Sequence, residues 1–148
     1  MLPGDPKLSL NVSRTIKASR EKVFDAFVIP ELRKQWWGVS AGDRCTPCEI
    51  DARTGGRYRI NMIRGNTEHI VGGEFHEVVR PAKLVFTWTW EAPTQDVQNS
   101  LVTIEFKALV EKQTEVTIKH ERFPTPVLRD LHAEGWAGCL KSVETFLQ

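Results

Sequence analysis

Two histidines in the C-terminal part of the chain have the types and positions best suited to chemistry. His120 ends a segment, 116–120, in which apolar and polar residues alternate, and it shares the parity of the apolar residues. His132 lies four residues before Trp136, so a helix would place both on one face. A neutral imidazole in a cavity can donate a hydrogen bond to a ligand carbonyl or phenol, or act as a general base. The alternative is a hydrogen-bonded structural role, which is the commoner one for an inward histidine.

Large aromatic and apolar side chains could supply the wall of such a cavity, because ligand pockets combine an apolar lining with a few polar groups. The chain contains five tryptophans, which are bulky for a small, tightly packed core. Mutual packing of these side chains in a core is the competing interpretation for each of them. The residues predicted to bind a ligand are Trp37, Tyr58, Met62, Phe86, Trp88, Trp90, His120, His132 and Trp136.

Other kinds of site have less support in the sequence. A metal site would need a third ligand beside the histidines, and no i, i+4 histidine pair or nearby carboxylate cluster supplies one. There is no Gly-x-Ser-x-Gly nucleophile motif. The glycine pairs at 55–56 and 72–73 fit a turn and a β-bulge rather than a phosphate-binding loop, because neither opens a helix. We therefore expect no metal and no cofactor.

Cys45 and Cys48 form a C-x-x-C motif, and Cys139 is the third cysteine. Redox pairs of this kind usually draw a low thiol pKa from a helix N-terminus, whereas the residues after Cys48 resemble a strand. Zinc would require a second ligand pair, which is missing. We expect free thiols, with Cys139 in the core of the C-terminal helix.

Composition narrows the range of partners. Twenty basic and 19 acidic residues give a net charge of +1, so no strong field attracts nucleic acid or an anionic membrane. No apolar run reaches the length of about 20 residues that spans a bilayer, and the N-terminus does not resemble a signal peptide. The 148 residues suit one domain, with residues 1–7 loose. The prediction is a cytoplasmic protein.

Hydrophobic periodicity predicts the elements that position these residues. Residues 125–148 have helical spacing, with Thr125 as N-cap, Pro126 as first helical residue and Leu131 on the apolar stripe. In 57–63 the alternation directs Tyr58 inward and Asn61 toward water. The expected order is strand 8–13, helices 20–28 and 30–36, strands 48–51, 57–63, 69–79 (with a bulge at 72–73), 84–90, 102–106 and 116–120, then the long helix. This is an α+β domain in which the helix covers the concave face of a curved antiparallel sheet of about six to seven strands.

Four segments, 32–37, 51–58, 73–87 and 135–136, together resemble the activator of the ninety-kilodalton heat-shock-protein ATPase. That family is a branch of the START-like, helix-grip or SRPBCC superfamily, and the resemblance runs from about Val12 to Gln148. It implies a helix-grip fold with a hydrophobic cavity between the sheet and the C-terminal helix. Members of the superfamily bind lipids, sterols, polyketides or plant hormones, and a minority catalyse cyclisation or hydration.

Three functions remain open on the sequence. The first is binding of a small apolar or aromatic molecule, and the second is an enzyme such as a polyketide cyclase or aromatase that uses the same cavity with His120 or His132 as acid or base. The third is a chaperone-associated interaction module that works through its outer surface, at Trp36-Trp37 and the cluster Arg53, Arg57 and Arg59. Trp36-Trp37 could instead cap the cavity mouth, and the arginines could simply form a solvated face. A homodimer could form through an unpaired sheet edge.

Overall fold

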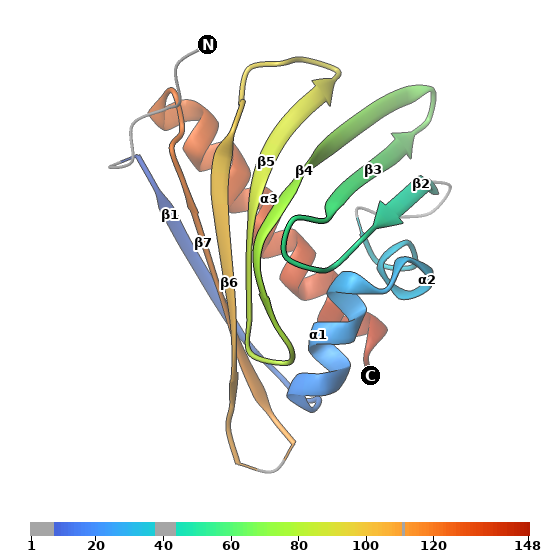
Figure 1. Ribbon diagram of the computed structural model, residues 1–148, viewed down its shortest axis with the longest axis vertical. Coiled ribbons are helices and arrows are strands. Elements are labelled where there is room, and N and C mark those ends of the chain that lie inside the picture. The colour runs from blue at the N-terminus through green and yellow to red at the C-terminus, as the bar shows by residue number, and fades with distance from the viewer. Residues whose placement is uncertain (1–7, 38–43, 111) are drawn as a thin grey trace.

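The computed structural model describes residues 8–37, 44–110 and 112–148. In these residues a curved antiparallel sheet of seven strands has the order β1-β7-β6-β5-β4-β3-β2, and α3 runs along one face of it (Figure 1). The helices α1 and α2 lie at one end of the sheet (Figure 1). The elements are β1 (Leu10–Ile16), α1 (Arg20–Val28), α2 (Pro30–Arg33), β2 (Arg44–Ile50), β3 (Arg57–Arg64), β4 (Thr67–Val79), β5 (Lys83–Ala92), β6 (Ser100–Ala108), β7 (Thr114–Glu121) and α3 (Pro126–Phe146). The predicted α+β, helix-grip architecture is confirmed.

The long helix α3 begins where the sequence predicts. The side chain of Thr125 accepts a hydrogen bond from the Leu128 backbone N–H at 3.2 Å, and Pro126 takes the first helical position, where its missing N–H costs nothing. Three residues of the helix are buried against the sheet: Trp136, Leu140 and Val143. The prediction that Leu131 faces the sheet is wrong, because this side chain is 57% exposed. It lies about 140° around the helix from Trp136, beyond the buried stripe.

Pairing between strands explains most of the boundary differences. The first strand extends to Ile16, beyond the predicted 8–13, because its register with β7 continues to Ile16↔Thr114. β2 starts at Arg44 instead of residue 48, so it contains both Cys45 and Cys48. The second helix ends at Arg33 rather than Trp36, and the chain continues in turns through Trp37. The predicted stop at Gly38 lies outside the described residues.

The glycine pair 72–73 does not form the predicted bulge. The register between β4 and β5 shifts on either side of it, between Ile70 and Val71 and between Phe75 and Glu77. Gly73 is required for another reason: a Cβ atom there would collide with the Thr87 carbonyl oxygen on β5. The absence of a side chain therefore permits the close approach of these two strands.

The alternation in β3 holds with one exception. Tyr58, Ile60 and Met62 are buried as predicted, and Arg57 and Arg59 are exposed. The prediction that Asn61 faces water is wrong, since it is only 3% exposed. Its Nδ2 donates to the carboxylate of Glu68, on the adjoining strand β4, at 2.7 Å.

Packing between sheet and helices differs at the two ends. Near α1, the space is filled by Phe24, Phe27 and Phe106, whose rings meet edge to face at 5.3 and 5.6 Å between centroids. At the other end tryptophans line the interior, and the space between them is not filled. In the part of the chain that the structure describes, no helix is long and apolar enough to cross a membrane.

Candidate functional site

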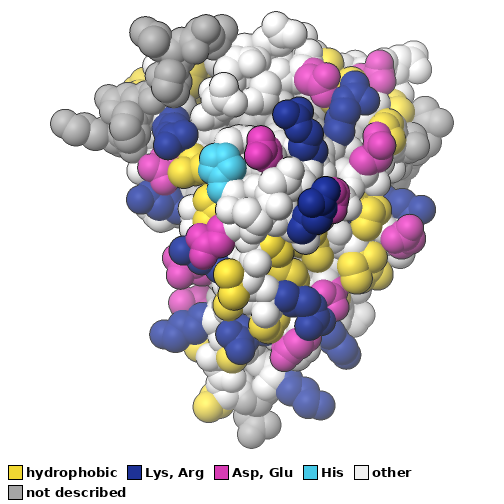
Figure 2. Space-filling model, in the orientation of Figure 1, with side chains coloured by type: hydrophobic (Ala, Val, Ile, Leu, Met, Phe, Trp, Pro, Cys, Tyr) yellow, Lys and Arg dark blue, Asp and Glu magenta, His cyan; other side chains and the backbone are white. Residues whose placement is uncertain are grey.

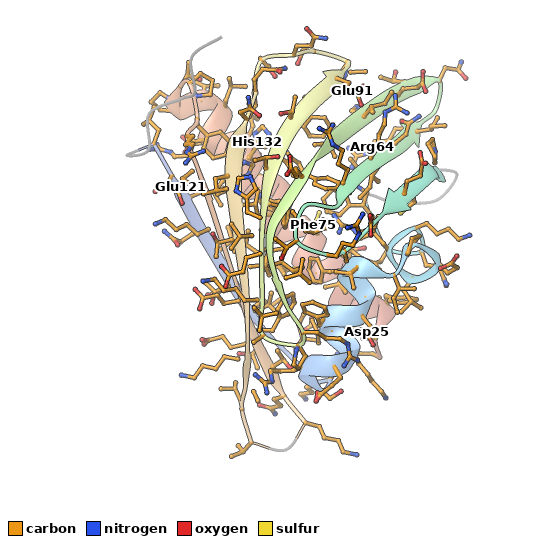
Figure 3. All side chains as sticks on the ribbon, viewed as in Figure 1. Asp25, Arg64, Phe75, Glu91, Glu121 and His132 are labelled. Carbon is orange, nitrogen blue, oxygen red and sulfur yellow. The ribbon has the colours of Figure 1, made fainter. Side chains whose placement is uncertain are left out.

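A pocket of about 200 Å³ opens between the first half of α3 and the ends of strands β3 and β5. Figure 3 labels two residues of its wall, His132 on α3 and Arg64 on β3, whereas Phe75 lies further toward α1. The lining is mostly apolar and contains four of the five tryptophans of the chain. The lining residues are Trp37, Met62, Arg64, Trp88, Trp90, Leu131, His132, Gly135, Trp136 and Cys139.

The indole rings of the wall hold one another in place. Trp88 is central, with ring centroids 5.1 Å from Trp136, 5.5 Å from Trp90 and 6.0 Å from Trp37. Trp37 and Trp136 also meet edge to face at 5.7 Å. Such aromatic pairs contribute about 0.5–1.5 kcal/mol each beyond their burial, so the wall is preorganised before any guest enters.

His132 fixes one tryptophan of this wall. The Trp90 indole N–H donates to His132 Nε2 at 2.9 Å, so Nε2 is an acceptor. His132 Nδ1 lies 2.8 Å from the Leu128 carbonyl oxygen, which can only accept, so the proton of the neutral ring is on Nδ1. Both ring nitrogens are therefore engaged with the protein.

His120 fixes a second tryptophan from behind the wall, with the opposite tautomer. The Trp136 indole N–H donates to His120 Nδ1 at 3.0 Å. The proton on Nε2 then points at the Ser100 hydroxyl, 2.7 Å away, and that hydroxyl donates to the Trp88 carbonyl at 3.1 Å. His120 is fully buried and does not line the pocket.

Burial keeps both histidines neutral. It lowers the pKa of His120 well below its ordinary value of 6.5, and the nearby His132 lowers it further. Burial also lowers the pKa of His132, opposed by the Leu128 carbonyl and the charge of Asp96. Because every ring nitrogen already has a protein partner, a role for either ring as general base would first require breaking one of these bonds. The arrangement is suited to binding.

The structure brings together six of the nine residues predicted to bind a ligand. Trp37, Met62, Trp88, Trp90, His132 and Trp136 line the pocket. Tyr58 and Phe86 instead pack with Phe75 at centroid distances of 5.4 to 5.7 Å, around a gap of only about 10 Å³. The Tyr58 hydroxyl donates to the Thr87 carbonyl at 2.6 Å, and burial raises the pKa of this phenol.

Four lining residues were not predicted to bind a ligand. Leu131, Gly135 and Cys139 are spaced four residues apart on α3, so helical periodicity from Trp136 and His132 could have identified them as one edge of the pocket. Arg64 ends β3 before a turn, where no pattern indicates its direction.

The tandem tryptophans do not form the exposed patch considered from the sequence. Trp36 is 1% exposed, and its indole N–H donates to the Ala26 carbonyl at 2.9 Å. Trp37 is 2% exposed and belongs to the pocket wall. The indole nitrogens of Trp37 and Trp88 are buried without a hydrogen-bond partner, which is an unfavourable state for a donor.

The arginine cluster lies apart from the pocket, and two of its members, Arg57 and Arg59, line a broad, shallow groove on the outer face of the sheet. Arg53, Arg57 and Arg59 are exposed. Arg59 pairs with Glu91 at 2.8 Å, and Figure 2 shows basic and acidic side chains interspersed over this face. Among the residues that the structure describes, no three His, Cys, Asp or Glu side chains come together as a metal site.

A curved antiparallel sheet gripping a C-terminal helix, with an aromatic pocket between them, defines a START-like, helix-grip protein. The model of one family within this class, the Activator of Hsp90 ATPase homolog 1-like proteins, matches residues 17–148. The chain belongs to this family. No curated protein sequence matches the chain at a significant level.

Solved structures show the same fold. Protein CV1439 from Chromobacterium violaceum superposes with a TM-score of 0.82 at 23% identity, over 94% of this chain and 96% of that one. An AHSA1-like protein from Aeromonas hydrophila gives 0.74 at 22% identity, over 93% and 92% of the two chains. An HSP90 activator from Plasmodium falciparum gives 0.70 at 23% identity, over 94% and 95%. At these identities the likeness concerns the fold.

Proposed function

We propose that this protein binds a small, flat aromatic molecule in the pocket between α3 and the sheet. The observation that carries the proposal is an unfilled space among four tryptophans, two of which are fixed by neutral histidines. The side chains of a protein core normally pack together and leave little empty space. Here hydrogen bonds to His132 and His120 fix the orientation of the Trp90 and Trp136 rings, so the space persists.

The volume limits the size of the guest. Pockets for drug-sized ligands usually measure about 300–1,000 Å³, whereas an apolar cavity of about 150 Å³ binds benzene. A pocket of about 200 Å³ therefore suits one or two fused rings rather than a lipid chain or a sterol. Indole faces and edges favour a planar aromatic surface.

The unpartnered indole N–H groups of Trp37 and Trp88 indicate a hydrogen-bond acceptor on the guest. Pairing a buried donor contributes about 0.5–1.5 kcal/mol, which corresponds to an affinity gain of roughly two- to tenfold.

Titration calorimetry with quinoline and naphthalene tests both parts of the proposal. The two probes have the same bicyclic shape, and only quinoline carries an acceptor nitrogen. We expect both to bind, quinoline about two- to tenfold more tightly. Absence of binding by either probe would contradict the size and shape argument, and equal affinities would contradict the role of the indole donors.

Two glycines of α3 provide a matched pair of variants. A Cβ atom at Gly135 would meet no other atom within 4 Å, and Gly135 lines the pocket, whereas Gly138 is equally open but borders a different depression beside Trp36. Gly135→Leu should weaken probe binding by more than about tenfold, since it occupies the space of the guest. Gly138→Leu should leave the affinity unchanged. Equal effects of the two substitutions on probe affinity would mean that the probe binds outside this pocket.

Interaction with a ninety-kilodalton heat-shock protein is a second candidate, favoured by the description of the family and of the Plasmodium relative. Burial of Trp36 and Trp37 moves any such interface away from these residues and toward exposed surfaces such as the arginine cluster. A pull-down with that chaperone tests it. Binding that survives Gly135→Leu and is lost on replacing Arg53, Arg57 and Arg59 with glutamine would support it. A cytoplasmic location, homodimer formation through a sheet edge and catalysis by a cyclase-like enzyme stay predictions from the sequence.

A further inference from the structure

Cys45 and Cys48 point to the same side of β2, although three residues separate them. Cys45 pairs with Met62 and Cys48 with Ile60, two residues of β3 that both face inward. An ordinary strand would direct side chains three residues apart to opposite faces. The register shift between the two cysteines adds one residue to β2, and this bulge restores the common direction. Ile60 and Met62 are two residues apart on β3, so the two thiols start from adjacent positions on one face of the sheet.

A buried cation belongs to α2, the helix that packs against β2. The Arg33 side chain is 6% exposed, its Nη1 donates to the Phe27 carbonyl at 2.7 Å, and its guanidinium stacks over the Trp37 ring at 4.1 Å. Its Nε has no hydrogen-bond partner, and no carboxylate among the described residues forms an ion pair with it. Burial lowers the pKa of this guanidinium, and the group whose negative charge would support it most is Cys48. A buried cation without a carboxylate favours ionisation of a nearby thiol.

The three cysteines differ in exposure and acidity. Cys48 is partly exposed, whereas Cys45 is buried. The hydrogen bond from Cys45 lowers the pKa of Cys48, with help from Arg33 and Lys34 and against burial and the Glu31 carboxylate. That same bond raises the pKa of Cys45, and burial raises the pKa of Cys139 to about 12. Of the three, Cys48 is the most suitable as a nucleophile.

We propose that Cys48 is a peroxide-sensitive thiolate and that Cys45 is the thiol that resolves it, so the bulge of β2 is a site of reversible oxidation. The Cys48 thiolate attacks one oxygen of a hydroperoxide, the O–O bond breaks, and the leaving alkoxide or hydroxide takes a proton to become alcohol or water. Cys48 becomes a sulfenic acid. Cys45 then attacks this sulfur, the S–O bond breaks, and the thiol proton leaves with the hydroxyl as water.

The buried guanidinium takes the role that a helix N-terminus has in other C-x-x-C pairs. The sequence argued against a redox role because no helix follows Cys48, and this remains true of the structure. However, α2, which precedes β2 in the chain, contributes the cation through its last residue, Arg33. The pair is separate from the ligand pocket, since neither Cys45 nor Cys48 lines it.

Site-resolved alkylation of the unmodified protein is the first test. Limited treatment of the full chain with iodoacetamide near pH 7, followed by peptide mass spectrometry, should label Cys48 at least about a hundredfold faster than Cys139. Lys34→Ala should slow labelling of Cys48 severalfold, because it removes an exposed cation without disturbing the core. Equal rates at Cys48 and Cys139 would overturn the proposal.

Oxidation with one equivalent of hydrogen peroxide is the second test. The wild type should lose the mass of two hydrogen atoms and yield a peptide linking Cys45 to Cys48, and a thiol reductant should reverse both changes. Cys139→Ser should behave like the wild type. Cys45→Ser should stop at a sulfenic acid on Cys48 that dimedone traps. Overoxidation of Cys48 without a disulfide in the wild type, or dimedone trapping at Cys139, would refute the pairing.

Discussion

Replacing His120 with leucine should remove a buried hydrogen-bond network. It should also remove one contribution to the free energy of unfolding that depends on pH. The fully buried ring accepts from the Trp136 indole N–H and donates to Ser100. Leucine fills much of the space but leaves the indole donor unpaired, which costs about 1–3 kcal/mol. Ser100 keeps its bond to the Trp88 carbonyl and adds little to the cost. Near neutral pH the variant should therefore be less stable by about 1–3 kcal/mol.

The pH dependence follows from the direction of the pKa shift. The pKa of His120 is lowered in the folded protein, so below its ordinary value of 6.5 the unfolded chain binds more protons than the folded one. The free energy of unfolding then decreases as the pH falls, until the pH reaches the folded pKa. One proton corresponds to about 1.4 kcal/mol per pH unit, so the wild type should lose up to about 2 kcal/mol between about pH 6.5 and pH 5. The leucine variant lacks this loss.

Urea unfolding followed by far-ultraviolet circular dichroism, at several values between about pH 7.5 and pH 5, measures the difference. The difference in free energy of unfolding between the wild type and His120→Leu should decrease steadily toward acid pH. Val143→Ala on α3 is the control, because it removes buried packing without a titratable group, and its difference from the wild type should stay constant. Parallel curves for the wild type and His120→Leu would refute the assignment of a neutral, buried imidazole.

Four further substitutions test the features that shape the fold. Gly73→Ala should destabilise the protein by more than about 3 kcal/mol in urea unfolding, because the added methyl group meets the Thr87 carbonyl. Gly135→Ala on α3 should instead stabilise the protein by about 0.5–1 kcal/mol. Similar effects of the two variants would contradict the close approach of β4 and β5. Thr125→Ala should cost about 1 kcal/mol through loss of the N-cap bond, and no change in the melting temperature would mean that the cap is not formed. Thr114→Val should cost about 1 kcal/mol or more, since its buried hydroxyl donates to a backbone carbonyl at 2.7 Å; a stability equal to that of the wild type would contradict that bond.

Most of the fold could be predicted from the sequence because local patterns and tertiary pairing agree. Thr125 and Pro126 define the start of α3 by local chemistry alone, and the helix starts there. Strand boundaries were less accurate, since a strand extends as far as its partner pairs with it. Ile16, for example, is in β1 because it faces Thr114 on β7. No property of residues 14–16 alone indicates that partner.

The site was predictable only in part, because parity along a strand selects the inner face and not the place along it. Tyr58 and Met62 both point inward from β3, yet Tyr58 packs into the core toward α1 and Met62 lines the pocket. Whether an inward residue of β3 is in the core or in the pocket wall depends on the rings that lie opposite it. The positions of those rings are set by α1 and α3. The inward direction predicted for His120 is also correct, but tertiary packing places this residue behind the pocket wall.

The buried His120, the half-buried His132 and the buried Arg33 follow one physical rule with opposite results. A buried ionisable group must either lose its charge or find a compensating partner. Imidazoles can lose the charge, so His120 and His132 become neutral acceptors that hold the indoles of Trp136 and Trp90. A guanidinium keeps its charge, so Arg33 needs an anion, and among the groups that favour its charged form Cys48 has the largest effect. Arg33→Met would remove this need, and the hydrogen bond from Cys45 would remain; labelling of Cys48 by iodoacetamide should then slow by about tenfold for each unit that its pKa rises.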